Sequence, residues 1–299
     1  MIATQANLEL RTVAPFDASA LRGFLAVHAI PGRDRVGDGG SSEHAVDVPG
    51  GLAVATIRWD EVVGDGLADV IIPVDFELPG NGEAADLEAA VRIVRRMLDL
   101  DAPMREVAAE LSSDDRLAGL VGARPGLRVP GARNLDEFAL GTVLGQQVSI
   151  AAGCTLQGRL VEHFGRSAPD LRGFSAGPDV ARIARTPAPE IQAALRLTGA
   201  RAETLRTLAI ALSAGLRLDS SADQVQTRAA LLELRGIGPW TVEMIAMRAL
   251  GDRDAFPAGD LILRKALEAD TDREVRGLGE AWRPYRAYAT QHLWAEYLA

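Results

Sequence analysis

The strongest constraint on the fold is a change of sequence pattern near Ala102. Before this residue, short segments rich in β-branched residues are separated by Gly and Pro, which is typical of strands joined by tight turns. After it, apolar residues recur at the three- and four-residue spacing of helices, and we find no convincing strand pattern. This order predicts an α+β chain, in which a small antiparallel sheet with two helices precedes an all-α region.

Local signals define the elements within this frame. In the N-terminal part, Asp17 is placed to cap a helix that continues to His28, and apolar spacing predicts a second helix from Ala84 to Leu98. The predicted strands are Leu8–Ala14, His44–Val48, Leu52–Trp59 and Ala68–Phe76. The segment Pro31–Ser42 is predicted to be a loop. The predicted helices of the second part span 102–121, 135–147, 148–164, 178–186, 189–197, 202–215, 222–234, 240–250, 260–269 and 279–297.

Composition excludes several classes of protein. A single cysteine, Cys154, leaves no partner for an internal disulfide, a cysteine zinc site or a cysteine-held iron–sulfur cluster. No stretch approaches the ~18 uncharged apolar residues of a membrane span. The first residues, Met1 to Glu9, lack a basic region ahead of an apolar core, so we expect no secretory signal. We therefore expect a cytoplasmic protein with no membrane partner.

Charge is distributed unevenly along the chain. The formal net charge is −9, but residues 1–115 hold 9 Lys and Arg against 21 Asp and Glu, whereas residues 116–299 hold 23 against 20. The simpler interpretation is an acidic N-terminal region that keeps the chain soluble and a second half close to neutral. The alternative is that the second half binds an anion. Composition alone favours the simpler interpretation.

A glycine pair joins two predicted helices in the most informative stretch, Leu231–Leu267. The joint reads Arg235-Gly236-Ile237-Gly238-Pro239, and Trp240-Thr241 opens the second helix. The glycines allow a tight turn and a close approach to another surface, while Ile237 would point inward. Amides near Gly238 would lie at a helix N-terminus, which favours an anion such as a phosphate. A tight turn between helices of any bundle would have the same pattern, so the pair alone does not decide.

An aspartate follows this turn at a fixed distance. Asp260 lies 22 residues after Gly238, at the end of the segment Phe256-Pro257-Ala258-Gly259-Asp260, where a new helix is predicted to begin. One interpretation is a helix N-cap, a common role of aspartate. The other is a carboxylate at the mouth of a cleft beside the hairpin. The residues alone favour the cap and leave both interpretations open.

Taken together, these motifs resemble a known superfamily. Residues 234–241 followed by Phe256-Pro257-x-x-Asp260 resemble the helix-hairpin-helix (HhH-GPD) DNA glycosylases. Segments 23–26, 123–131, 144–149 and 291–294 resemble one branch of it, the AlkA-type 3-methyladenine DNA glycosylases II, in the same order along nearly the whole chain. The resemblance implies an AlkA-like α+β domain at 1–113. It also implies an all-α HhH-GPD glycosylase region at 114–299, with two helical lobes flanking the active-site cleft.

The resemblance also implies roles for individual residues. Asp260 matches the catalytic carboxylate, which would stabilise an oxocarbenium-like sugar and orient water. Positions of the base pocket match Trp240, Trp294, Phe24, Met244 and Leu261, of which Met244 and Leu261 replace aromatic residues. Gln147 matches the wedge that fills the gap left by a flipped base. The DNA phosphate site of the hairpin matches Arg235, Gly236, Ile237, Gly238 and Thr241. The carbonyls of Leu234 and Ile237 match those that bind a monovalent cation, Na⁺ or K⁺, and no other cofactor is implied.

The predicted function is that of a monofunctional DNA glycosylase acting in base excision repair. It would flip out and hydrolytically excise alkylated purines, including 3-methyladenine and 7-methylguanine, from double-stranded DNA, as a monomer in the bacterial cytoplasm at the nucleoid. Trp240 stands where related lyases place a lysine nucleophile, and the only lysine is Lys265. Two alternatives stay open. One is an 8-oxoguanine-type glycosylase/lyase, and the other is a non-catalytic hairpin protein that binds damaged DNA.

Overall fold

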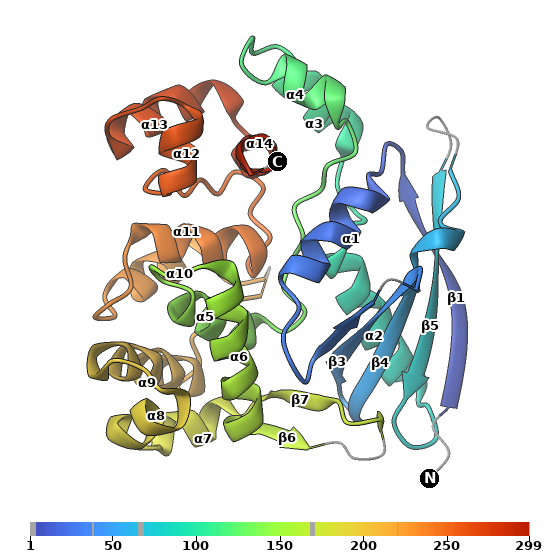
Figure 1. Cartoon of the computed structure of the whole chain (residues 1–299), viewed down its shortest axis with the longest axis vertical. Helices are drawn as coiled ribbons and strands as arrows, with labels where there is room; N and C mark the ends of the chain where they lie inside the picture. The colour runs from blue at the N-terminus through green and yellow to red at the C-terminus, as the bar shows by residue number, and fades with distance from the viewer. Residues whose placement is uncertain (1–3, 38, 65–68, 168–170, 220, 299) are drawn as a thin grey trace.

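The computed structural model describes residues 4–37, 39–64, 69–167, 171–219 and 221–298. It confirms an α+β chain, with an antiparallel sheet on one side and helices on the other (Figure 1). The strands are β1 (Thr4–Val13), β2 (Asp34–Val36), β3 (Ser41–Val48), β4 (Gly51–Arg58), β5 (Asp69–Leu78), β6 (Gly165–Ser167) and β7 (Ser175–Pro178). The helices up to residue 164 are α1 (Ala18–Val27), α2 (Ala84–Met97), α3 (Met104–Leu111), α4 (Ala118–Ala123), α5 (Leu135–Leu144) and α6 (Ile150–Phe164). The later helices are α7 (Val180–Arg185), α8 (Ala188–Leu195), α9 (Gly199–Ser213), α10 (Gln224–Leu232), α11 (Pro239–Arg248), α12 (Leu261–Ala266), α13 (Asp272–Gly279) and α14 (Arg286–Tyr297).

The larger sheet has the strand order β1-β5-β4-β3-β2 within the described residues, and all neighbours are antiparallel. A tight turn at Pro49 and Gly50 joins β3 to β4, since Val48 pairs with Gly51. The first strand begins at Thr4, earlier than predicted. The predicted loop after Pro31 contains the short edge strand β2. Ala68, predicted to open the last strand, lies outside the described residues.

Two hydrophobic clusters divide the molecule. Helix α2 packs on the sheet through Ala90 and Val94, which belong to a cluster that runs from Leu10 to Leu100. A second cluster collects the apolar faces of the helices from Ala102 to Leu293. Residues at the end of the predicted N-terminal domain, including Leu111, therefore contribute to the helical core. The boundary between residues 113 and 114 stays a prediction.

The helical part is not purely helical, which corrects the prediction of an all-α region from 114 onward. Strands β6 and β7 pair antiparallel between α6 and α7. Leu171, Phe174 and Ala176 pack there against residues of the large sheet, including Leu52 and Val54. This small sheet is stabilised by a partner surface far away in the sequence, so its local pattern carries little strand signal.

Most predicted helices shift by one to three residues at an end, and the helix pattern differs further at three places. The predicted helix 102–121 is two helices, α3 and α4. Ser113 donates to the Glu110 carbonyl and Asp114 accepts from the Arg116 N–H between them, and such local side-chain bonds compete with helix continuation. Helix α13 was not predicted as a separate helix. The predicted helix 279–297 begins as a short 3₁₀ turn and continues as α14 only after Pro284.

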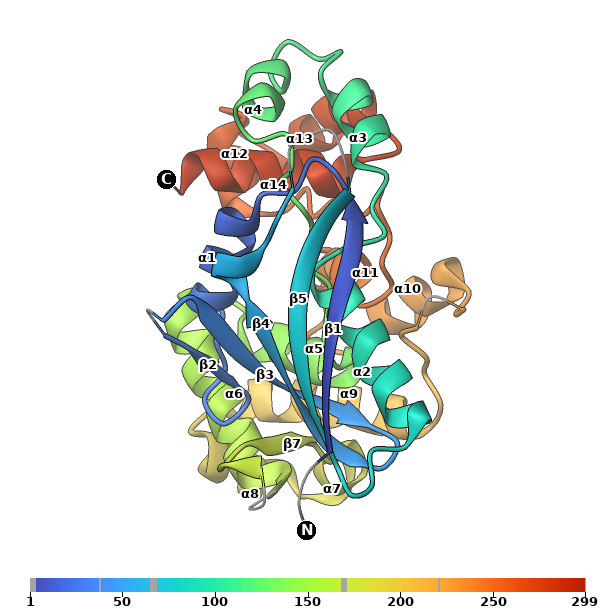
Figure 2. The same cartoon turned by 90° about the vertical axis from the view of Figure 1, so that its right-hand side faces the viewer.

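The N-terminal part and the helical part meet along α1. Figure 1 shows α1 on the edge of the N-terminal part that faces the helices, and Figure 2 shows α14 above it. Asp17 caps α1 as predicted, accepting from the Ala20 N–H at 2.8 Å, while its own N–H donates to the Gly126 carbonyl at 3.1 Å. In the described part of the chain, no helix is both long enough and apolar enough to cross a bilayer.

Candidate active site

Asp260 begins helix α12 and caps it. Its Oδ1 accepts hydrogen bonds from the backbone N–H groups of Ile262 (2.9 Å) and Leu263 (3.1 Å). These are amides that a helix N-terminus leaves without an internal partner, so the cap fixes both the helix start and the carboxylate. The capping interpretation from the sequence is confirmed. It does not displace the other interpretation, because the same carboxylate has further partners.

Two indoles hold the rest of this carboxylate. The Nε1 of Trp240 donates to Oδ2 of Asp260 at 3.0 Å, and the Nε1 of Trp294 donates to Oδ1 at 3.0 Å. Trp240 lies in the first turn of α11 and Trp294 lies in α14, so three helices converge on one side chain. All three side chains are half-buried. Two residues predicted as pocket aromatics thus contact the predicted catalytic residue directly.

Phe24 lies further along the same side of the molecule, on α1. Its ring stacks on the His28 imidazole, with ring centres 4.0 Å apart, and the Arg248 guanidinium lies 4.5 Å from its centre. Burial and the Arg248 charge together lower the pKa of His28 to about 4, so this imidazole is neutral at pH 7. The Phe24 ring therefore already has an aromatic partner and a cationic partner.

Arg248 connects Phe24 to α14, the helix that carries Trp294. The buried Arg248 donates to Oε1 of Gln291 at 3.4 Å, and Gln291 precedes Trp294 by three residues, on the same face of α14.

The two remaining residues of the predicted base pocket differ in exposure. Met244 is half-buried one helical turn after Trp240, whereas Leu261 is 59% exposed.

The hairpin between α10 and α11 has the geometry that its two glycines predict. Gly236 has a φ of 89°, and a Cβ placed there would overlap Oγ1 of Thr204. Gly238 has an ordinary φ of −103° and caps α11 with open space beside it. Ile237 is buried as predicted, and Arg235 is exposed. The open side of the hairpin thus presents Gly238 and the N-terminus of α11.

The predicted wedge lies beside this hairpin. Gln147 is exposed, with a φ of 55°, in the loop between α5 and α6. The preceding residue, Gln146, joins that loop to the hairpin, because its Nε2 donates to the Gly236 carbonyl (3.0 Å) and to Oγ1 of Thr241 (2.9 Å). Thr241 is buried, so its hydroxyl serves this contact. Arg201 donates to the Gln146 carbonyl at 2.7 Å and fixes the loop from α9.

Gln146 and Arg248 are residues whose roles the sequence did not reveal. Gln146 stands inside a predicted motif, yet only the folded chain shows that it joins wedge loop and hairpin. Arg248 carried no signal at all, since an arginine at the end of a helix is usually a surface residue.

Groups of three or more His, Cys, Asp or Glu side chains placed to hold a metal are absent from the described residues. The predicted cation donors are main-chain carbonyls instead. The Leu234 carbonyl accepts from the Ile237 N–H at 3.0 Å, which leaves its second lone pair free, so the donors are compatible with a monovalent cation. The arrangement as a whole offers an anion held beside two indole rings, next to the open side of the hairpin.

Comparisons with known proteins place the chain in a family. A family model described as the AlkA N-terminal domain matches residues 7–134. The chain is 38% identical over 296 residues to a Mycobacterium tuberculosis protein named probable bifunctional transcriptional activator/DNA repair enzyme AlkA. That alignment covers 96% of this chain and 56% of the relative, so the chain spans little more than half of that protein's length.

A second relative matches along nearly its whole length. The chain is 30% identical over 281 residues to DNA-3-methyladenine glycosylase 2 of Escherichia coli, which covers 94% of each protein. Among solved structures, a 3-methyladenine DNA glycosylase from Archaeoglobus fulgidus superposes with a TM-score of 0.79 at 20% identity. It covers 97% of this chain and 98% of the other. At that identity the likeness shows a common fold.

Proposed function

The chain belongs to the AlkA family of DNA-3-methyladenine glycosylases, and on this premise we propose that it is a monofunctional DNA glycosylase that excises alkylated purines by hydrolysis. The observation that carries the proposal is the carboxylate of Asp260 with an indole N–H of Trp240 and of Trp294 on it, each at 3.0 Å. A helix cap alone needs neither indole. Two indole rings beside the carboxylate are expected where a flat base binds and positive charge develops on the sugar.

The chemistry follows from charge. An alkylated purine carries a positive charge and is already a good leaving group, so no strong general acid is needed. As the N-glycosidic bond breaks, positive charge develops on the sugar, and the fixed Asp260 carboxylate stabilises it. Oδ1 accepts three hydrogen bonds, whereas Oδ2 accepts one, from Trp240. We assign Oδ2 to the sugar and to the attacking water, because it has the lone pairs that are still open.

The base would be recognised by its shape and charge. The faces of Trp240 and Trp294 attract a flat cation through their π electrons, and Met244 and Leu261 would complete the pocket with non-aromatic surface. Phe24 is already in contact with His28 and Arg248, so we assign it to the outer end of the pocket. A pocket with fewer free aromatic rings is expected to accept bases of varied shape.

The DNA would be held at the hairpin. We propose that the amides of Gly236, Gly238 and Thr241, together with the exposed Arg235, bind a phosphate near the lesion, while the Ile237 N–H stays on the Leu234 carbonyl. Gln147 would enter the duplex and face the orphaned partner base. A K⁺ or Na⁺ on the carbonyls of Leu234 and Ile237 would support the hairpin. Exchanging K⁺ for tetramethylammonium at constant ionic strength is then expected to weaken DNA binding without unfolding the chain.

The partner would be chromosomal double-stranded DNA in the bacterial cytoplasm, bound by one copy of the chain. The alignment covers only 56% of the mycobacterial relative, so the activity of a whole protein of that length is part of this proposal. Sedimentation of the chain with a duplex that contains a single abasic analogue tests the stoichiometry, and a 1:1 complex is expected.

The central experiment measures release of free 3-methyladenine and 7-methylguanine from methylated duplex DNA. The unaltered chain is expected to release both, and Asp260→Asn is expected to lose at least about a hundredfold of the rate. Asparagine caps helices as well as aspartate does, so the variant should remain folded and bind DNA. An unaltered chain that binds DNA and releases neither base would contradict the proposal.

A lyase activity is tested separately. If Lys265, the only lysine, attacked the sugar, borohydride would trap a covalent complex with damaged DNA, and Lys265→Arg would abolish trapping. We expect no trapping with the unaltered chain on alkylated or 8-oxoguanine DNA. Lys265 is exposed on α12, and no described contact directs it toward Asp260.

A further inference from the structure

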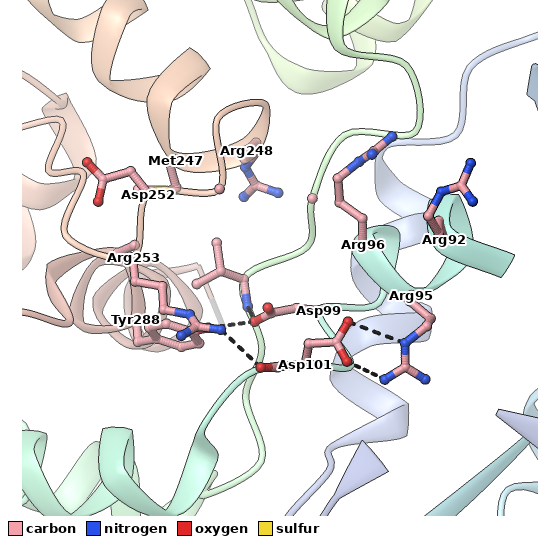
Figure 3. Close-up of a pocket in the computed structure, with 14 residues that line it drawn as sticks. Arg92, Arg95, Arg96, Asp99, Asp101, Met247, Arg248, Asp252, Arg253 and Tyr288 are labelled. Carbon is pink, nitrogen blue, oxygen red and sulfur yellow. Dashed lines mark hydrogen bonds and ion pairs between the residues drawn. The ribbon is translucent and has the colours of Figure 1, made fainter. Parts of the chain in front are cut away.

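A pocket of about 410 Å³ lies between α2 and the segment that follows α11. Asp260, Trp240 and Trp294 are not among the described residues that line it. Figure 3 shows basic side chains on both sides of it, some from α2 and others from the end of α11 and the loop beyond. The arginines that line it are Arg92, Arg95, Arg96, Arg248 and Arg253.

The basic side of α2 stands out from its surroundings. Residues 1–115 hold 9 basic residues against 21 acidic ones, yet three of those nine lie within one stretch of α2. Arginines in the last turn of a helix are favoured by its dipole, which accounts for Arg95 and Arg96 but not for Arg92. Burial, and after it the Arg92 charge, lowers the pKa of Arg96. Like charges are thus held together on this face.

The carboxylates of the pocket do not balance this charge. Asp101 pairs with Arg95, and Asp252 pairs with Arg228, which is not part of the pocket lining. Asp99 accepts a hydrogen bond from the Tyr288 hydroxyl at 2.8 Å, and burial raises its pKa to about 6. At pH 7 Asp99 is still mostly ionised, so three carboxylates face the five arginines of the lining.

The other four arginines form no salt bridge with any described residue. Arg92 is exposed and has no described hydrogen bond, while Arg96 and Arg253 donate to the carbonyls of Ala132 and Asp101. Arg248 is buried, donates to the Pro130 carbonyl at 3.1 Å, and burial lowers its pKa to about 10. Carbonyls orient these guanidinium groups without neutralising them, so the pocket keeps a positive charge.

We propose that this pocket binds a phosphate group. Guanidinium forks match phosphate oxygens in geometry as well as in charge, and arginines from two sides can contact one phosphate together. The volume lies in the range of small-molecule sites, roughly 300–1000 Å³. The phosphate belongs either to a small phosphorylated compound or to a DNA backbone. Because Arg248 lines the pocket and also contacts the Phe24 ring, an occupant would share a residue with the candidate active site.

Calorimetric titration of the intact chain with inorganic pyrophosphate tests the proposal, and it does not depend on base excision. We expect saturable binding of one equivalent, weakened about tenfold in Arg92→Gln. Asp99→Asn is expected to tighten binding severalfold, because it removes a negative charge and asparagine tolerates the φ of 51° at this position. Arg276→Gln, an equal change of charge at an exposed position of α13, is the matched control and should leave binding unchanged.

A second arm separates the two sources of phosphate. If the phosphate belongs to DNA, pyrophosphate will not bind, and Arg92→Gln will weaken binding of an undamaged duplex and flatten its salt dependence, whereas Arg276→Gln will not. If neither pyrophosphate nor DNA distinguishes Arg92→Gln from Arg276→Gln, the proposal is wrong. Loss of base excision with normal pyrophosphate binding would count against the proposed function and leave this pocket intact.

Discussion

Trp240 and Trp294 are 54 residues apart in the sequence, yet both donate an indole N–H to the carboxylate of Asp260. The resemblance assigned them to the pocket for their aromatic faces. The structure adds that their ring nitrogens orient the carboxylate. A hydrogen bond to a charged group contributes about 1.5–3 kcal/mol, so this second task is as important as stacking.

Trp294→Phe separates the two tasks, because it keeps an aromatic face and removes the donor. We expect the excision rate to fall about 10- to 100-fold, while the midpoint of urea unfolding changes little. Trp59→Phe is the matched control, since Trp59 donates its Nε1 to Ser42 at 2.8 Å in the N-terminal part, far from Asp260. Equal excision rates for Trp294→Phe and Trp59→Phe would show that the hydrogen bond from Trp294 to Asp260 does not contribute to the rate.

A buried histidine makes stability depend on pH. Burial, and after it the Arg124 charge, lowers the pKa of His292 to about 4, whereas an unfolded histidine titrates near 6.5. Between these values the unfolded chain binds more protons, so this stability is full above about pH 6.5 and is lost as pH falls toward 4. His292→Gln should flatten the pH dependence of the unfolding free energy. The contribution of His292 to that free energy is at most about 3 kcal/mol.

Urea unfolding at pH 7.5 and pH 5 measures this effect. His163→Gln provides the comparison, because His163 is exposed on α6 and its replacement should leave the pH slope as it was. If His292→Gln has the same slope as the unaltered chain, His292 does not titrate as described.

At the scale of elements, the two hairpin glycines have different tasks. In Gly236→Ala, the alanine would have to adopt a left-handed φ, and its Cβ would overlap Thr204, whose hydroxyl donates to the Ala200 carbonyl. We therefore expect the free energy of unfolding to fall by about 1–3 kcal/mol. Gly238→Ala meets open space at an ordinary φ and should lose less than about 1 kcal/mol. Its methyl group would instead crowd the proposed phosphate and weaken DNA binding.

Thermal unfolding and duplex binding of the two variants check this division. A Gly236→Ala chain as stable as Gly238→Ala would refute the strain argument. If Gly238→Ala binds DNA as tightly as the unaltered chain does, the proposal that a phosphate binds at this turn is wrong.

Elements stabilised by their own pattern could be predicted from the sequence, and those stabilised by distant partners could not. The capped helix α1, the β3–β4 turn and the hairpin before α11 carry local signals, such as Asp17 and Gly236. The small β6–β7 sheet depends on Phe174 packing against β3 and β4, so its sequence looks like a loop. At the candidate site, the motif positions were predictable, but Gln146 and Arg248 act through contacts that span the fold.

At the scale of the whole molecule, buried ion pairs join the sheet to the helices. Arg133, just before α5, binds Asp34 of β2 with two hydrogen bonds of 2.6 and 2.5 Å, and Asp34 also contacts Nδ1 of His44 at 2.7 Å. Burial alone would raise the pKa of Asp34, but the Arg133 charge and His44 outweigh it and hold that pKa well below its usual range. Nearby, Arg33 joins Asp47 to Glu137.

Asp34→Asn would leave Arg133 without its partner between the two parts of the molecule. We expect a loss of about 3–5 kcal/mol in unfolding free energy. Glu61→Gln breaks an exposed pair with Arg58 and should lose no more than about 1 kcal/mol. Urea unfolding followed by fluorescence compares the two variants. Similar unfolding midpoints would mean that the Asp34–Arg133 pair does not stabilise the contact between the sheet and the helices.

The cap at Asp260 bears on how such a chain could change over generations. Helix α12 needs a capping side chain at position 260 whether or not a sugar is ever cleaved, and aspartate meets this need, so a descendant that had lost the reaction could keep it unchanged. Helix capping places no such demand on the indole nitrogens of Trp240 and Trp294. Among chains of this architecture, an aspartate at this position therefore indicates only a capped helix. The tryptophan pair is the better indicator that the chain is an active enzyme.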